Sequence, residues 1–195
     1  MSNNRNPLVI KLNNNDLERV DQLAKEQSDK YGHDKGYFTL GRDESSHKIG
    51  FVGEIGVLRF FKQEYNLNEP KDIGQEEMGG KFDAYIIING IKHFLHIKTG
   101  RWNNWPTDNM TFGVHFAQKI EESNSPVILI SYLKDNESLI KIEGFITDDE
   151  FGKCKLIKKG KLFPGMNYPS RTDNRLTYFN QYKDIKEIIK YLKNK

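Results

Sequence analysis

The sequence has very little cysteine, with Cys154 as the only one among 195 residues. A single cysteine cannot form an internal disulfide, and it cannot provide the Cys/His cluster of a structural zinc site. The longest apolar runs, at 86–88 and 127–130, have the length of strands and are too short to cross a membrane. The N-terminal residues contain no apolar segment of signal-peptide type. We therefore expect a cytoplasmic protein with no membrane span and no structural zinc.

The chain also lacks low-complexity blocks, internal repeats and a glycine loop with the spacing that cradles phosphates. Charged residues make up 29% of the sequence and aromatic residues 12%, a mixture that favours a folded globular protein. This length suits one well-buried domain and is too short for two of ordinary size. We therefore assign residues 1–195 to a single domain.

The net charge of +3 is unevenly distributed along the chain. The segment from Lys153 to Lys195 has twelve Lys/Arg against three Asp/Glu, whereas residues 121–150 have two Lys against eight acids. A basic C-terminal quarter suits a polyanion such as nucleic acid. Lysine-rich surfaces also occur on proteins that bind no polyanion, so the charge alone does not assign a function.

The spacing of apolar residues predicts both helices and strands. Strands are expected at 8–12, 126–133 and 139–146, with a turn at 134–137 between the last two. Helices are expected at 15–31 (with Asn15 and Glu18 as a capping pair), 48–65, 114–121 and 182–192. Residues 126–133 are nearly all apolar, as in a central strand covered on both faces. These elements predict an α/β protein of the α+β type, with a central sheet flanked by helices.

The most informative stretch is residues 81–98. Two β-branched runs flank Asn89-Gly90, the strongest short-range signal for a hairpin with a two-residue type I′ turn. This turn sets the register, so Asp83 is expected opposite His96, with Lys98 one pleat further along the same face. Each of these residues alone is also typical of an ordinary strand end in contact with solvent. Their predicted convergence is what indicates a chemical site.

Glu54 lies upstream on the expected helix 48–65. It falls on the same helical stripe as the apolar residues Leu58 and Phe61. A glutamate on the buried side of a helix is costly unless it is paired or ligates a cation. The alternative is that Glu54 is an acid of the first helical turn, stabilised by the helix dipole.

The order of Gly53 and Glu54 on a helix, then Asp83, then a strand ending at Lys98 resembles the PD-(D/E)XK nuclease superfamily. This superfamily includes many restriction endonucleases, Holliday-junction resolvases and repair nucleases. The resemblance covers about a third of the chain, roughly residues 48–118. It implies a restriction-endonuclease-like fold, with a mixed central sheet flanked by helices.

The resemblance also implies roles for individual residues. Asp83 and Glu54 match metal-binding carboxylates, the backbone carbonyl of Ile97 matches a further metal ligand, and Lys98 matches the lysine that orients or activates the attacking water. His96 stands where the family usually has Glu or Asp. A neutral imidazole suits Mn²⁺ and softer metals better than Mg²⁺. Three roles stay open for His96: a ligand of such a metal, a general base, or the mark of a site that has lost catalysis.

The loop after Lys98 contains Arg101, Trp102 and Trp105. Exposed aromatic residues beside a basic residue can stack on bases or insert into a groove. The two tryptophans could equally pack over the end of the sheet. Gln118 matches, weakly, a glutamine that some family members have on the next helix, and Lys119 beside it is a further candidate for nucleic-acid contact.

The activity implied by these residues is metal-dependent hydrolysis of DNA phosphodiester bonds, with Mg²⁺ or Mn²⁺ as cofactor. The resemblance to restriction enzymes further implies double-stranded DNA as the substrate, a type II restriction role and a homodimer. Two alternatives stay open. One is a catalytically inactive nucleic-acid-binding module on the same fold, and the other is a protein-assembly component in which the hairpin charges are incidental.

Overall fold

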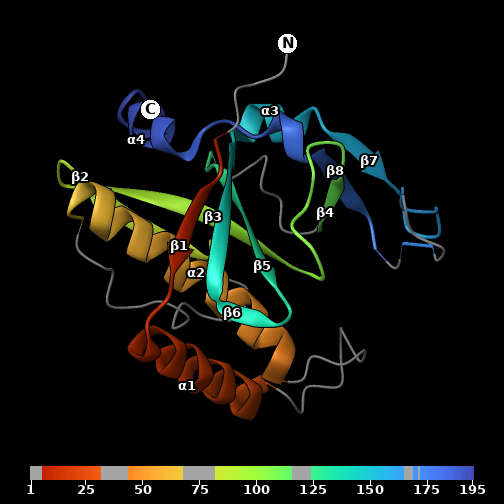
Figure 1. Cartoon of the computed structure of the whole chain (residues 1–195). Helices are drawn as coiled ribbons and strands as arrows, with labels where there is room; N and C mark the ends of the chain where they lie inside the picture. Colours follow the sequence, from red (N-terminus) through yellow and green to blue (C-terminus); the bar gives the residue numbers. More distant parts are fainter. Residues whose placement is uncertain (1–5, 32–43, 68–81, 116–123, 165–168, 171) are drawn as a thin grey trace.

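The computed structural model describes residues 6–31, 44–67, 82–115, 124–164, 169–170 and 172–195. Its main sheet has five strands in the order β1-β6-β5-β3-β2 (Figure 1). These strands are β1 (Leu8–Lys11), β2 (Ala84–Ile88), β3 (Ile91–Trp102), β5 (Val127–Leu133) and β6 (Asn136–Ile146). A smaller sheet has the order β4-β8-β7, formed by β4 (Thr111–His115), β7 (Lys155–Ile157) and β8 (Asn174–Tyr178).

The main sheet is mixed. Strands β3 and β5 pair in parallel, whereas the other neighbouring strands of this sheet pair antiparallel. All residues of β5 from Val127 to Tyr132 are buried, which confirms that this strand is central and covered on both faces. The prediction of a mixed sheet with helices, in an α+β arrangement, is therefore confirmed.

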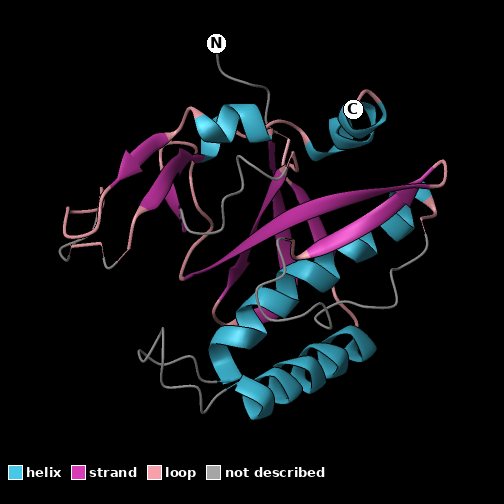
Figure 2. Ribbon diagram, turned by 180° about the vertical axis from the view of Figure 1, so that it is seen from behind, coloured by secondary structure: helices cyan, strands magenta, loops and turns pink. Residues whose placement is uncertain are grey.

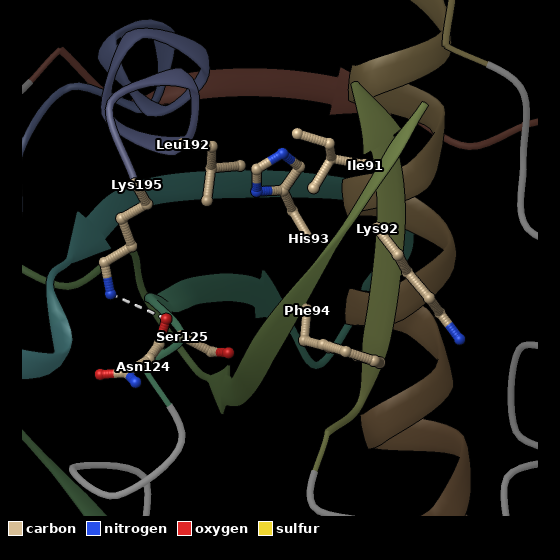
Figure 3. A pocket seen from close by; sticks show the side chains of 8 residues that line it. All are labelled: Ile91, Lys92, His93, Phe94, Asn124, Ser125, Leu192 and Lys195. Atoms are coloured by element: carbon tan, nitrogen blue, oxygen red, sulfur yellow. Dashed lines mark hydrogen bonds between the residues drawn. The ribbon is translucent and has the colours of Figure 1, made fainter. Parts of the chain in front are cut away.

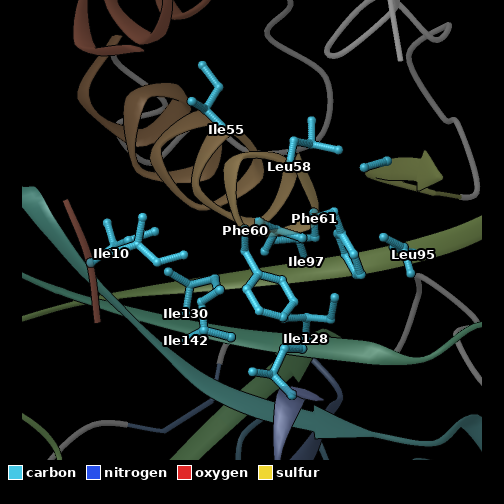
Figure 4. Close-up of a cluster of buried hydrophobic side chains, with 14 of the residues drawn as sticks. Ile10, Ile55, Leu58, Phe60, Phe61, Leu95, Ile97, Ile128, Ile130 and Ile142 are labelled. Atoms are coloured by element: carbon cyan, nitrogen blue, oxygen red, sulfur yellow. The ribbon is translucent and has the colours of Figure 1, made fainter. Parts of the chain in front are cut away.

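Two long helices, α1 (Asn14–Tyr31) and α2 (Glu44–Tyr65), lie on one face of the main sheet (Figures 1 and 2). Alternate residues of β5, Ile128 and Ile130, point toward α2 and join one core cluster with Phe60 and Phe61 (Figure 4). The arginine Arg59 of α2 also donates a hydrogen bond to the carboxylate of Asp16 in α1. Helix α2 is therefore held between the sheet and α1.

The second face of the main sheet is covered by the smaller sheet and the short helix α3 (Asp148–Gly152). Val127 and Leu129 point to this side because side chains alternate along a strand. They join a separate buried cluster with Val114 of β4 and Phe151 of α3. Within the described residues, no helix is both long and apolar enough to cross a membrane.

Several local predictions need correction. The cap of α1 is formed by Asn13 and Asp16, each of which accepts a hydrogen bond from the other's backbone N–H, at 2.9 and 2.8 Å, and not by Asn15 and Glu18. The strand at 139–146 begins earlier, at Asn136. The strand predicted to end at Lys98 continues to Trp102, so Arg101 and Trp102 lie in β3 and not in a loop. The predicted helix 114–121 is wrong at its start because Val114 and His115 end strand β4, while residues 116–123 lie outside the described part of the chain.

The C-terminal helix is shorter than predicted. A 3-10 turn at Ile185–Glu187 precedes helix α4 (Ile188–Lys193). The carboxylate of Asp184 accepts the N–H of Lys186 at 2.9 Å, so the chain turns at this point. Ile188 and Leu192 still pack against the first core cluster, as the amphipathic pattern predicted.

The β2–β3 hairpin has the predicted register. Its pairs run from Ile88 with Ile91 to Ala84 with Leu95. Asn89 and Gly90 have φ angles of 52° and 80°, and positive φ at both central residues is what a type I′ turn requires. The turn therefore determines which side chains of the hairpin share a face.

Candidate active site

Asp83 lies directly before β2, where the regular pairing with β3 ends. Its backbone N–H donates to the carbonyl of Leu95 at 3.1 Å, although Leu95 is already the partner of Ala84. Asp83 therefore leaves the ladder, and its carboxylate oxygen Oδ2 accepts the N–H of Ile97 at 2.8 Å. A side chain thus satisfies a β3 amide that lies beyond the last regular backbone pair.

Lys98 donates from Nζ to the same Asp83 oxygen at 2.7 Å. The Asp83 side chain is 25% exposed and that of Lys98 is 14% exposed, so water reaches this ion pair only partly. A hydrogen bond between two charged groups in such surroundings is stronger than one on an open surface. The structure therefore brings Asp83 and Lys98 together, as the sequence predicted.

His96 is placed differently from the prediction. It does not pair directly with Asp83, because Asp83 has left the ladder, and the distance from His96 Nδ1 to Asp83 Oδ2 is 4.0 Å. The imidazole is only 2% exposed, and its ring centroid lies 5.5 Å from that of Phe82. Burial lowers the pKa of His96 to about 4, although the nearby Asp83 opposes this shift. The ring is therefore neutral at pH 7.

Glu54 approaches the site from α2. Helix α2 begins at Glu44, so Glu54 lies in the helix interior and the first-turn alternative is wrong. Burial raises the pKa of Glu54 to about 8, with a further contribution from the Asp83 carboxylate and an opposing one from Lys98. Its Oε2 is buried and has no hydrogen-bond partner among the described residues. Two carboxylates and one lysine therefore influence one another electrostatically at this edge of β3.

Helix α2 and strand β3 approach each other closely beside Glu54, at a glycine of the helix. A Cβ atom added to Gly53 would lie only 1.9 Å from Oγ1 of Thr99. Thr99 is the residue after Lys98, and its hydroxyl is also buried without a hydrogen-bond partner in the described chain. Gly53 is therefore the residue that lets α2 bring Glu54 toward β3. A glycine within a helix was the only signal for this contact in the sequence.

Replacing Gly53 with alanine is expected to destabilise the protein by about 1–3 kcal/mol, since the added methyl group would force α2 away from Thr99. The matched control is Gly50→Ala on the same helix. There the new Cβ would lie 3.9 Å from Glu54 Oε1, an ordinary contact, and alanine favours the helix by up to about 1 kcal/mol. Urea unfolding measures both variants. Equal stability of the two variants would show that the Gly53–Thr99 contact does not constrain α2.

The candidate nucleic-acid contacts do not form one group. Arg101 is exposed, whereas Trp102 packs against Phe112 and Phe179, with ring centroids 6.5 and 5.7 Å apart. This packing matches the alternative in which Trp102 covers the sheet. Trp105 is partly buried, and Nζ of Lys141 lies 5.0 Å from its ring centroid. Gln118 and Lys119 lie outside the described residues.

The donor atoms at the site suit a hard divalent cation. Asp83 and Glu54 offer carboxylate oxygens, and Ile97 could add its backbone carbonyl. Mg²⁺ is usually bound by one or two carboxylates, with water and substrate phosphates as its other ligands. In the part of the chain that the structure describes, no group of three or more His, Cys, Asp or Glu side chains is arranged to hold a metal. The buried, unpartnered Oε2 of Glu54 is the feature that fits a cation best.

No protein-family model matches this sequence, and no curated protein matches it.

Proposed function

We propose that this protein is a metal-dependent nuclease that hydrolyses DNA phosphodiester bonds on a restriction-endonuclease-like fold. The observation that carries the proposal is the convergence of Glu54, Asp83 and Lys98 at the edge of β3 where β2 pairing ends. The mixed sheet and the predicted hairpin register are consistent with that fold. A type II restriction role, in a homodimer acting on duplex DNA, extends the proposal by resemblance.

In this proposal Asp83, Glu54 and the carbonyl of Ile97 hold Mg²⁺ or Mn²⁺. The bound ion would polarise the scissile phosphate and lower the pKa of the attacking water. Lys98 donates to Asp83 and acts electrostatically on Glu54, and it would stabilise the negative charge that develops on the phosphate. The Asp83 carboxylate holds Nζ of Lys98 and also anchors the Ile97 amide, so it orders this part of β3.

The basic C-terminal quarter would bind the DNA backbone. Five lysines on or beside β7 are exposed, and they are Lys153, Lys155, Lys158, Lys159 and Lys161. Contacts between lysines and phosphates supply affinity without sequence readout, and that affinity falls as the salt concentration rises. DNA binding without any salt dependence would therefore contradict this part of the proposal.

The direct test is cleavage of plasmid and linear DNA with Mg²⁺, Mn²⁺ or EDTA. We expect cleavage with at least one of the two metals and none in EDTA. Discrete fragments would indicate a sequence-specific enzyme, whereas nicking or smearing would indicate a structure-specific or non-specific one. DNA binding without cleavage under any of these conditions would contradict the nuclease assignment.

One observation favours the second candidate, a non-catalytic nucleic-acid-binding module. His96 replaces the usual carboxylate, and its neutral ring is buried 4.0 Å from Asp83. It therefore adds no negative charge to the site. Binding of a metal ion separates this candidate from the nuclease, because a site that has lost catalysis is expected to bind Mn²⁺ or Mg²⁺ poorly.

Thermal unfolding in the presence of metal measures this binding. At a concentration about 100-fold above the dissociation constant, Mn²⁺ or Mg²⁺ is expected to stabilise the wild-type chain by about 2.7 kcal/mol. This corresponds to a rise of roughly 5–10 °C in Tm for a protein of this size. Asp83→Asn should show little of this rise, whereas the exposed control Asp135→Asn should show all of it. An equal rise in Asp83→Asn would place the metal elsewhere.

A further inference from the structure

The hairpin face that carries Lys98 also carries Lys92 and Phe94, because side chains alternate along β3. Figure 3 shows that Lys92 projects on the opposite side of the strand from Ile91 and His93, which lie toward Leu192. On strand β2, the cross-strand partners of Phe94 and Lys92 are Tyr85 and Ile87. These four residues therefore share the face that leads to the candidate active site.

The aromatic residues on this face form a continuous row, which we call the aromatic strip and define as Tyr85, Phe94 and Phe82. Tyr85 meets Phe94 edge to face, with ring centroids 6.3 Å apart. Phe94 stacks on Phe82 at 4.1 Å, with an interplanar angle of 19°. Phe82 directly precedes Asp83 in the chain. The strip therefore runs along the hairpin and ends at the carboxylate that holds Lys98.

The aromatic strip is only partly buried. Each of its three side chains has intermediate exposure, and the neighbouring Ile87 is 54% exposed. The exposed Lys92 places Nζ 3.6 Å from the ring centroid of Tyr85 and 4.9 Å from that of Phe94. This surface therefore combines rings in contact with water, the Lys92 cation over them, and Lys98 at the end of the strip. It suits a ligand with flat apolar groups and negative charges.

We propose that the aromatic strip binds an unpaired DNA strand and leads it to Asp83 and Lys98. Bases would stack on Tyr85 and Phe94, and Lys92 would contact a phosphate. Aromatic residues on a sheet surface are a common platform for unpaired bases, because every base has a flat face. Base pairs inside a duplex keep those faces covered by their neighbours. This inference rests on the proposed nuclease function and specifies its substrate as DNA with an unpaired strand, in place of the intact duplex that the resemblance implies.

Fluorescence anisotropy in EDTA tests the binding step without cleavage. The probes are a labelled single-stranded oligonucleotide, the matching blunt duplex, and the same duplex with an unpaired tail. Phe94→Leu and Tyr85→Leu keep an apolar side chain but remove the ring. Each is expected to weaken binding of the single strand and of the tailed duplex about tenfold, with little change for the blunt duplex. The control Ile91→Ala removes apolar surface from the same strand on its opposite face.

Unchanged single-strand affinity in both Leu variants would overturn the inference, as would an equal loss of blunt-duplex binding. If Phe94→Leu changed self-association without changing DNA affinity, the strip would be a protein interface instead. Cleavage assays separate this inference from the proposed function. If Phe94→Leu binds and cuts every DNA probe like wild type, the aromatic strip does not bind DNA, while the nuclease proposal stands. If Phe94→Leu loses single-strand binding but the wild-type protein cuts no DNA, the aromatic strip binds DNA and the nuclease proposal fails.

Discussion

Asp83→Asn is expected to lower the rate of metal-dependent DNA cleavage by a factor on the order of 10³ while leaving the fold intact. Asparagine keeps the size of the side chain and an oxygen that can accept the Ile97 N–H, now received at 2.8 Å. It removes the negative charge that would hold a cation and that positions Lys98. Initial cleavage rates with Mn²⁺, measured beside circular dichroism and thermal unfolding, separate loss of chemistry from loss of structure.

Lys98→Ala tests the other half of this ion pair. The same fall in cleavage rate is expected, because the cation beside the reacting phosphate is lost, while Asp83 still accepts the Ile97 amide. The control Lys134→Ala removes an exposed lysine from the turn between β5 and β6 and should cut like wild type. If either Asp83→Asn or Lys98→Ala also cuts like wild type, this edge of β3 is not the catalytic site.

Glu54→Gln is expected to make the metal-free protein more stable at alkaline pH, although it weakens the metal site. Burial, then the Asp83 carboxylate, raises the pKa of Glu54 from its usual 4.5 to about 8. The folded chain therefore favours the protonated acid, and this stability is present below pH 4.5 and is lost as the pH rises toward 8. Glutamine resembles the protonated acid at every pH, so the variant avoids this loss.

The titration of His96 narrows the pH window in which the stability loss caused by Glu54 can be measured by itself. Burial lowers its pKa from 6.5 to about 4, so its contribution to stability is present above pH 6.5 and is lost as the pH falls through 4. Between pH 4.5 and 6.5 the slopes from Glu54 and His96 therefore oppose each other. Of these two groups, Glu54 alone contributes a slope above pH 6.5, so the window to measure is pH 6.5 to 8.

Across that window, the wild-type chain in EDTA is expected to lose about 2 kcal/mol of stability. This corresponds to a fall of about 4–8 °C in Tm for a protein of this size. Glu54→Gln should show a nearly flat Tm in the same buffers, and saturating Mn²⁺ should restore the stability of the wild type only. A wild-type Tm that does not change over this range would mean that Glu54 is ionised without cost in the folded protein, so that no cation is needed to stabilise it.

Local sequence patterns predicted much of the framework around the candidate site. Asn89-Gly90 specified the hairpin and its register, because the two-residue type I′ turn requires positive φ at both central residues and Asn-Gly adopts it readily. The apolar run of β5 identified the central strand, and the helical stripe of α2 located Glu54 beside buried residues. Each of these patterns depends on neighbours that are close in the sequence.

The chemistry of the site depended on contacts between distant segments. The register placed Asp83 opposite His96, but the chain leaves the ladder at Asp83, because its carboxylate and backbone N–H find partners at Ile97 and Leu95. The raised pKa of Glu54 comes from burial and from Asp83, which belongs to another element. The spacing of apolar residues within a single segment cannot predict these contacts or the raised pKa.

The sequence by itself determined the two long helices, the main strands, the hairpin register and the set of residues worth testing. Only the tertiary structure decided that Asp83 holds Lys98, that His96 is buried as a neutral ring, and that Gly53 packs against Thr99. Backbone conformation follows from side chains a few residues apart, whereas ionisation and close packing follow from which distant side chains exclude water from one another.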